Sequence, residues 1–89
     1  MKVIITGVCG FIGFHLCKKL LQTNFQIVGI DNFNSYYDPQ LKEERLKELY
    51  KNVINNNFKI YRNDIRNFEK LSEIFEDCKP DVVVNLAAQ

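Results

Sequence analysis

The sequence has little of several residue types on which whole classes of protein depend. It contains no tryptophan, two prolines, three cysteines and one histidine in 89 residues. The cysteines Cys9, Cys17 and Cys78 are odd in number, widely spaced and without a C-x-x-C pair, so neither a disulfide framework nor a zinc site is expected. A chain that uses cysteine in this way fits a reducing compartment, and the expected location is cytoplasmic.

An excess of charge of one sign is also missing. Twelve Lys and Arg residues stand against eleven Asp and Glu residues, which gives a net charge of +1. This balance supplies no electrostatic reason to expect nucleic acid or a membrane surface as a partner. No apolar run reaches the roughly 18–20 residues that span a bilayer. Glycines interrupt the apolar stretch that follows Met1, which argues against a signal peptide.

Short apolar runs alternate along the chain with segments of helical spacing. We expect strands at residues 2–6, 25–31, 58–61 and 82–86, and helices at 11–23, from 39 to about 50, and from 68 to before Pro80. Strands without a polar face, separated by segments of helix length, are typical of a parallel sheet that is covered on both sides. The sequence therefore predicts an α/β fold in the order β-α-β-α-β-α-β.

Two of these helices begin at residues suited to capping. Asp38 precedes Pro39, which loses no hydrogen bond at the first helical position, and Asn67 precedes the third helix. The side chains of the third helix that we expect to face the sheet are Phe68, Leu71, Ile74 and Phe75.

A glycine-rich loop between the first strand and the first helix is the first chemical signal. Gly7, Gly10 and Gly13 are spaced three apart at the point where free N–H groups and the helix dipole attract an anion. A Cβ at these positions would obstruct the turn or the approach of a diphosphate. Taken alone, the three glycines are equally compatible with a loop that only shapes a turn.

The end of the second strand supplies a second signal. Asp31 stands where a carboxylate accepts hydrogen bonds from the ribose hydroxyls of a bound adenine dinucleotide and repels a 2′-phosphate. Alone, Asp31 could be a solvated loop acid. Together with the glycine loop, it predicts binding of NAD rather than NADP in a doubly wound sheet of Rossmann type.

Three segments then resemble one family. The sequence TGVCGFIG at residues 6–13 resembles the T-G-x-x-G-F-I-G signature of the extended short-chain dehydrogenase/reductases, the NAD-dependent epimerase/dehydratase family. NDIR at 63–66 and LAA at 86–88 resemble the G-D-I-R and H-L-A-A segments of that family, with Asn63 in place of Gly and Asn85 in place of His.

The resemblance implies a set of cofactor contacts. NAD would be held by Gly7, Gly10, Phe11, Ile12, Gly13, Asp31, Asn32, Asp64, Ile65, Leu86, Ala87 and Ala88. Asp64 would contact the adenine ring, although an exposed acid that pairs with Arg66 is the alternative. His15 is expected to shape packing near the start of the first helix, and Cys9 to be a small filler rather than a reactive thiol.

A narrower resemblance concerns residues 31–46. This stretch is similar to the D-N-x-N-x-Y-Y-D-x-x-L-K-x-x-R-L segment of UDP-glucuronate 4-epimerases. The similarity implies reversible hydride transfer at carbon 4 of a nucleotide-linked sugar, with a Tyr-x-x-x-Lys pair as the base. None of Tyr36, Tyr37, Tyr50 and Tyr61 has a lysine four residues later, so no catalytic residue is named and the chain is expected to be inactive alone.

The expected organisation is therefore a partial domain. Residues 1–89 would form the N-terminal portion of an NAD-binding domain, without the substrate domain, and a nucleotide sugar would bind only in a full-length protein. The expected strand order 3-2-1-4 leaves strand 82–86 at an edge, although its valines suit a strand covered on both sides and flanked by a neighbour. The alternative is a non-catalytic nucleotide-binding module that another chain completes, with association through this incomplete edge.

Overall fold

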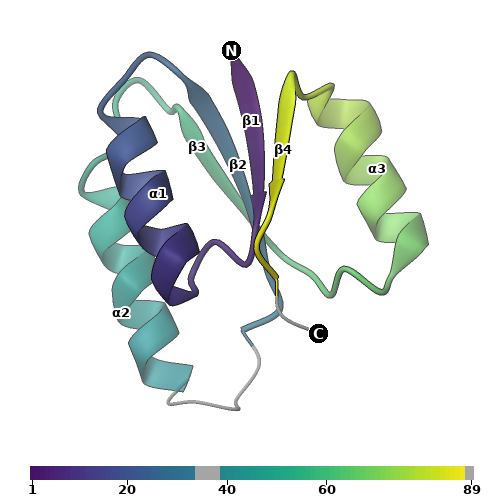
Figure 1. Cartoon of the computed structure of the whole chain (residues 1–89), viewed down its shortest axis with the longest axis horizontal. Helices are drawn as coiled ribbons and strands as arrows, with labels where there is room; N and C mark the ends of the chain where they lie inside the picture. The colour runs from purple at the N-terminus through teal and green to yellow at the C-terminus, as the bar shows by residue number, and fades with distance from the viewer. Residues whose placement is uncertain (34–38, 88–89) are drawn as a thin grey trace.

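The computed structural model describes residues 1–33 and 39–87, so the expected cap at Asp38 lies outside the described residues. Strands and helices alternate as the sequence predicts (Figure 1), which confirms the α/β fold class. The elements are β1 (Lys2–Thr6), α1 (Phe11–Leu21), β2 (Gln26–Asp31), α2 (Pro39–Tyr50), β3 (Phe58–Arg62), α3 (Phe68–Cys78) and β4 (Val82–Asn85).

The four strands form one parallel sheet in the order β3-β2-β1-β4, as expected. In the register of the sheet, Ile4 of β1 lies opposite Val28 of β2 and Val83 of β4. The helices α1 and α2 lie on one side of the sheet and α3 lies on the other (Figure 1). Because all four strands are parallel, their carboxyl ends lie at one edge of the sheet.

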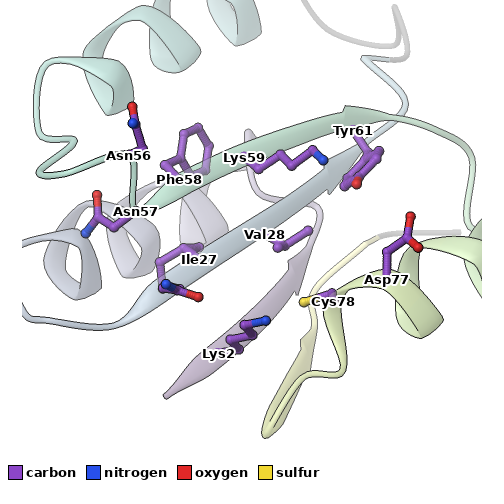
Figure 2. Close-up of a pocket in the computed structure, with 11 residues that line it drawn as sticks. Lys2, Ile27, Val28, Asn56, Asn57, Phe58, Lys59, Tyr61, Asp77 and Cys78 are labelled. Carbon is purple, nitrogen blue, oxygen red and sulfur yellow. The ribbon is translucent and has the colours of Figure 1, made fainter.

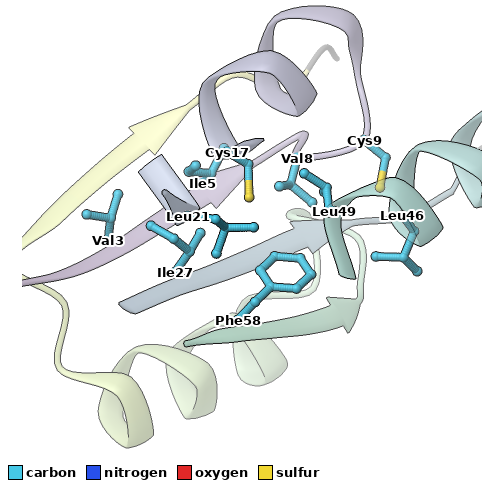
Figure 3. Close-up of a cluster of buried hydrophobic side chains, with 10 residues drawn as sticks. All are labelled: Val3, Ile5, Val8, Cys9, Cys17, Leu21, Ile27, Leu46, Leu49 and Phe58. Carbon is cyan, nitrogen blue, oxygen red and sulfur yellow. The ribbon is translucent and has the colours of Figure 1, made fainter. Parts of the chain in front are cut away.

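The larger core lies between the sheet and the helices α1 and α2. Its members come from β1, the loop after it, α1, β2, α2 and β3 (Figure 3): Val3, Ile5, Val8, Cys9, Cys17, Leu21, Ile27, Leu46, Leu49 and Phe58. The opposite face holds a smaller cluster of Ile4, Ile30, Ile74 and Cys78. Alternate residues of β1 thus enter different clusters, as the two-residue period of a strand requires.

The third helix begins as expected but buries fewer side chains. The Asn67 side chain accepts a hydrogen bond from the Lys70 N–H at 3.2 Å, which confirms the predicted cap. Ile74 is buried, and Leu71 and Phe75 pack against the smaller cluster. The expectation for Phe68 is wrong, because its side chain is 76% exposed. The cluster on this face is built from few residues and does not extend to the first residue of α3.

The last strand lies at the edge of the sheet. Among the described residues β4 pairs only with β1, and Val82 and Val83 are 40% and 45% exposed. The expected edge position is therefore confirmed, but β4 is not covered on both sides. No helix in the described part of the chain has the length and apolar character needed to cross a membrane.

The end of α3 provides a test of the backbone geometry. Lys79 adopts the left-handed conformation, with φ 49° and ψ 65°, and its N–H donates to the Phe75 carbonyl at 2.8 Å. Lys79→Gly relieves the Cβ conflict of that conformation and is expected to raise the free energy of unfolding by about 0.5–1 kcal/mol in urea denaturation. Lys47→Gly, in the interior of α2, is the control and is expected to lower it by about 1 kcal/mol. Equal losses in both variants would contradict the assignment.

Candidate functional site

The residues singled out by the sequence converge on the carboxyl edge of the sheet. The glycine loop follows β1, Asp31 ends β2, Asp64 follows β3 and Leu86 follows β4. Backbone hydrogen bonds join these segments. The Gly7 N–H donates to the Ile30 carbonyl at 2.7 Å, and the Asn63 N–H donates to the Asp31 carbonyl at 3.0 Å. Ligands of open α/β sheets bind in the crevice at this edge.

Two of the three loop glycines are required by packing of the backbone. Gly7 has φ +72°, and a Cβ there would stand 2.8 Å from the Ala87 nitrogen. A Cβ on Gly13 would stand 2.2 Å from the Gly7 carbonyl oxygen. The first glycine therefore admits the chain that follows β4, and the third lets α1 pack closely on the end of β1.

Gly10 is less crowded than the other two glycines of the loop. A Cβ there would have one neighbour within 4 Å, the Gly7 carbonyl oxygen at 3.2 Å. Gly10 is also the N-cap of α1, and within the described residues no side chain caps that helix start. Phe11 and Ile12 follow and are 67% and 65% exposed. The first turn of α1 thus presents N–H groups and bare main chain, an arrangement suited to an anion.

Asp31 is the most tightly held side chain at this edge. The residue is 4% exposed, and its Oδ2 accepts the Cys9 N–H at 3.0 Å. Its Oδ1 accepts the Phe33 N–H at 2.8 Å and the Lys42 ammonium at 3.0 Å. The carboxylate therefore links the glycine loop, the end of β2 and helix α2. It is not the solvated loop acid of the alternative interpretation.

Helix α2 contributes two cations to the site. Lys42 pairs with Asp31, and one turn later the Arg45 guanidinium donates to the Cys9 carbonyl at 2.9 Å. Sequence reasoning missed both roles, because each bond joins residues that lie 11 or more positions apart in the chain. Their spacing of three residues on a helix that follows a buried acid is the signal that could have revealed them.

Asp64 has the partner that the alternative interpretation predicts. Arg66 donates to it from its backbone N–H at 2.9 Å and from its guanidinium at 2.6 Å. These bonds lower the pKa of Asp64 to about 2. Ile65 is half-buried against the smaller cluster, and Asn32 lies exposed beside Asp31. A contact of Asp64, Ile65 or Asn32 with adenosine stays a prediction.

The segment after β4 is tied to the end of β1. The Thr6 hydroxyl donates to the Asn85 side-chain oxygen and accepts the N–H groups of Leu86 and Ala87 at 3.1 and 3.4 Å. Asn85, which departs from the family pattern, therefore connects the two strands at the site. Ala88 lies outside the described residues, and a contact of Leu86 or Ala87 with a cofactor stays a prediction.

The thiols are unsuited to nucleophilic chemistry. Burial, reinforced by the nearby Asp31 charge, raises the pKa of Cys9 to about 12, and burial raises the pKa of Cys17 to about 12. Both thiols stay protonated near neutral pH.

The only histidine of the sequence packs against aromatic rings. His15 lies edge-on against Phe11 and Phe14, with ring centroids at 4.8 and 5.1 Å. The described residues include no group of three side chains that could hold a metal ion.

A shallow pocket of about 240 Å³ lies elsewhere, at the amino ends of the strands (Figure 2). Lys2, Gln26 and Phe58 from the beginnings of β1, β2 and β3 line it, together with Asp77 and Cys78 of α3. It contains none of the residues expected to contact NAD, so it does not belong to the site at the carboxyl edge.

The contrast between two loop glycines is testable. Gly13→Ala forces a Cβ against a backbone carbonyl and is expected to lower the free energy of unfolding by about 2 kcal/mol or more. In Gly10→Ala the Cβ approaches a single backbone atom, the Gly7 carbonyl oxygen, to 3.2 Å, so a small shift relieves the contact and the expected cost is less than about 1 kcal/mol. Chemical denaturation followed by circular dichroism measures both values. Equal costs would contradict the geometry of the loop.

Comparison with known proteins agrees with this architecture. The family model described as GDP-mannose 4,6-dehydratase matches residues 4–89. The chain is 47% identical over 89 residues to Protein CapI of Staphylococcus aureus, covering 100% of this chain and 25% of that protein. It is 44% identical over 86 residues to UDP-glucuronate 4-epimerase of Thermodesulfobacterium geofontis, covering 97% of this chain and 26% of that enzyme.

A solved structure shows the same arrangement. UDP-glucose 4-epimerase of Thermus thermophilus, in complex with NAD, has a TM-score of 0.72 and 28% identity, covering all of this chain and 24% of its own. This chain therefore spans about a quarter of the length of these three proteins. It belongs to the NAD-dependent epimerase/dehydratase family and is homologous to the N-terminal part of UDP-glucuronate 4-epimerases.

Proposed function

We propose that this chain binds NAD, as the N-terminal portion of the nucleotide-binding domain of a nucleotide-sugar epimerase of the UDP-glucuronate 4-epimerase type. The observation that carries the proposal is the bare main chain at Gly10, at a helix start without a side-chain cap and one strand away from Asp31. A side chain at Gly10 would stand in front of this helix start, so a glycine there fits the close approach of a diphosphate to the main chain.

Each segment of the site has a distinct task in this proposal. The N–H groups of the first turn of α1 bind the diphosphate, and Asp31 accepts the hydroxyls of the adenosine ribose. Asn32, Asp64 and Ile65 border the adenosine, while Leu86 and Ala87 extend the same edge beside β1. NAD is favoured over NADP because a carboxylate repels a 2′-phosphate.

The reaction itself is proposed for a whole protein of this type. Bound NAD supplies acceptance and return of a hydride at sugar carbon 4. The tyrosines of this chain have no lysine four residues later, so the chain offers no Tyr-x-x-x-Lys pair to hold the proton. The residues present bind and orient the cofactor, and a nucleotide sugar would bind in the full-length protein.

A second candidate function is a nucleotide-binding module completed by another chain. The observation that favours it is the exposure of Val82 and Val83 on a strand that pairs, among the described residues, only with β1. Such an edge offers backbone donors and acceptors to an added strand. A strand from a second polypeptide would then complete the sheet that this chain begins.

Isothermal titration calorimetry of the chain with NAD and NADP tests the proposal. Asp31→Ala removes the ribose acceptor and is expected to weaken NAD binding by about 10- to 100-fold, with a smaller loss for NADP. Gly10→Val is expected to abolish binding while the helix content measured by circular dichroism stays nearly unchanged.

Asp77→Ala, which removes an exposed acid on α3, is the matched control and should leave the affinity for NAD unchanged. Absence of NAD binding by the folded unmodified chain would refute the proposed function. Equal losses of NAD and NADP affinity in Asp31→Ala would refute the role of Asp31.

A further inference from the structure

We propose that Lys42 is a displaceable counter-ion of Asp31 that weakens discrimination between NAD and NADP. This inference rests on the proposed function and concerns the same site. It begins from an ion pair that the family resemblance did not assign, in which the Lys42 Nζ lies 3.0 Å from the Asp31 Oδ1. The two side chains are 18% and 2% exposed, so water screens the pair only in part.

The hydrogen-bonding capacity of Asp31 shows why Lys42 must move. A carboxylate offers about four acceptor positions, two on each oxygen. The Phe33 N–H and the Lys42 ammonium fill Oδ1, and the Cys9 N–H takes one position on Oδ2. One position is left, whereas the two hydroxyls of a ribose need two. Lys42 is the side-chain donor of the three, so it is the group that can leave without a change of the backbone.

Helix α2 does not depend on this ion pair. Arg45 donates to the Cys9 carbonyl, and Arg62 of β3 binds both oxygens of Glu43 at 2.6 and 2.8 Å. Leu46 and Leu49 are buried in the larger core. The Lys42 ammonium can therefore leave Asp31 while α2 stays in place, and its stem keeps the charge close to the ribose.

The consequence for selectivity follows from the charge. Without Lys42, Asp31 would present a full negative charge to a 2′-phosphate. The Lys42 ammonium lies 3.0 Å from the Asp31 Oδ1 and offsets part of this charge. A 2′-phosphate entering the site would gain Lys42 as a partner and meet a weaker repulsion. Lys42 thus lowers the preference for NAD that Asp31 alone would create.

The test measures the ratio of the dissociation constants of NADP and NAD by calorimetry. Lys42→Met removes the charge and keeps an aliphatic stem, and is expected to raise this ratio about tenfold without weakening NAD binding. Lys42→Arg keeps the charge and should keep a ratio near that of the unmodified chain. Lys47→Met removes the same charge from an exposed position of the same helix and should leave the ratio unchanged.

Several outcomes would overturn the inference. If Lys42→Met binds NAD and its ratio of dissociation constants stays within twofold of that of the unmodified chain, the role of Lys42 is refuted. The proposed function is not affected by this result. Equal losses of NAD and NADP affinity would show that Lys42 holds the dinucleotide rather than competing with it, and would refute displacement. If Lys42→Met fails to fold by circular dichroism, Lys42→Gln supplies the same charge change. Absence of NAD binding by the unmodified chain would refute the proposed function and this inference with it.

Discussion

The structure depends on a buried carboxylate at the carboxyl edge of the sheet. Asp31 is 4% exposed, and a charged group so far removed from water is tolerated only when it is hydrogen-bonded and paired. Two backbone N–H groups and the Lys42 ammonium meet this requirement. The two N–H groups fix the glycine loop and the end of β2 around the carboxylate, and Lys42 adds a contact from α2.

The three glycines of the loop have different roles in this arrangement. Gly7 and Gly13 are needed because main-chain atoms approach them too closely for a Cβ, whereas a Cβ on Gly10 would meet a single backbone oxygen at 3.2 Å. The loop is therefore held from both sides, by Asp31 through the Cys9 N–H and by the segment after β4 at Gly7. The N–H groups at the start of α1 are left facing outward, which is the geometry that an anion requires.

The sequence predicted the order of the elements from local patterns, such as the β-branched run of β1 and the cap at Asn67. The strand order was expected together with the family resemblance, and the structure also brings the glycine loop next to Asp31. The sequence did not predict the exposure of Phe68 or of the β4 valines, because apolar content does not reveal how much surface a face offers to cover them. It also missed the bonds of Lys42, Arg45 and Asn85, which join segments far apart in the chain.

The central claim is that an adenine dinucleotide binds at the carboxyl edge of the sheet, between the glycine loop and Asp31. Titration of the ¹⁵N-labelled chain with NAD, followed by amide NMR signals, tests it most directly. The account predicts saturable shifts for Gly7, Cys9, Gly10 and Phe33, with the signals of Gln26 and Lys59 at the opposite edge unchanged. Shifts confined to the opposite edge, or no saturable shift in a folded sample, would contradict it.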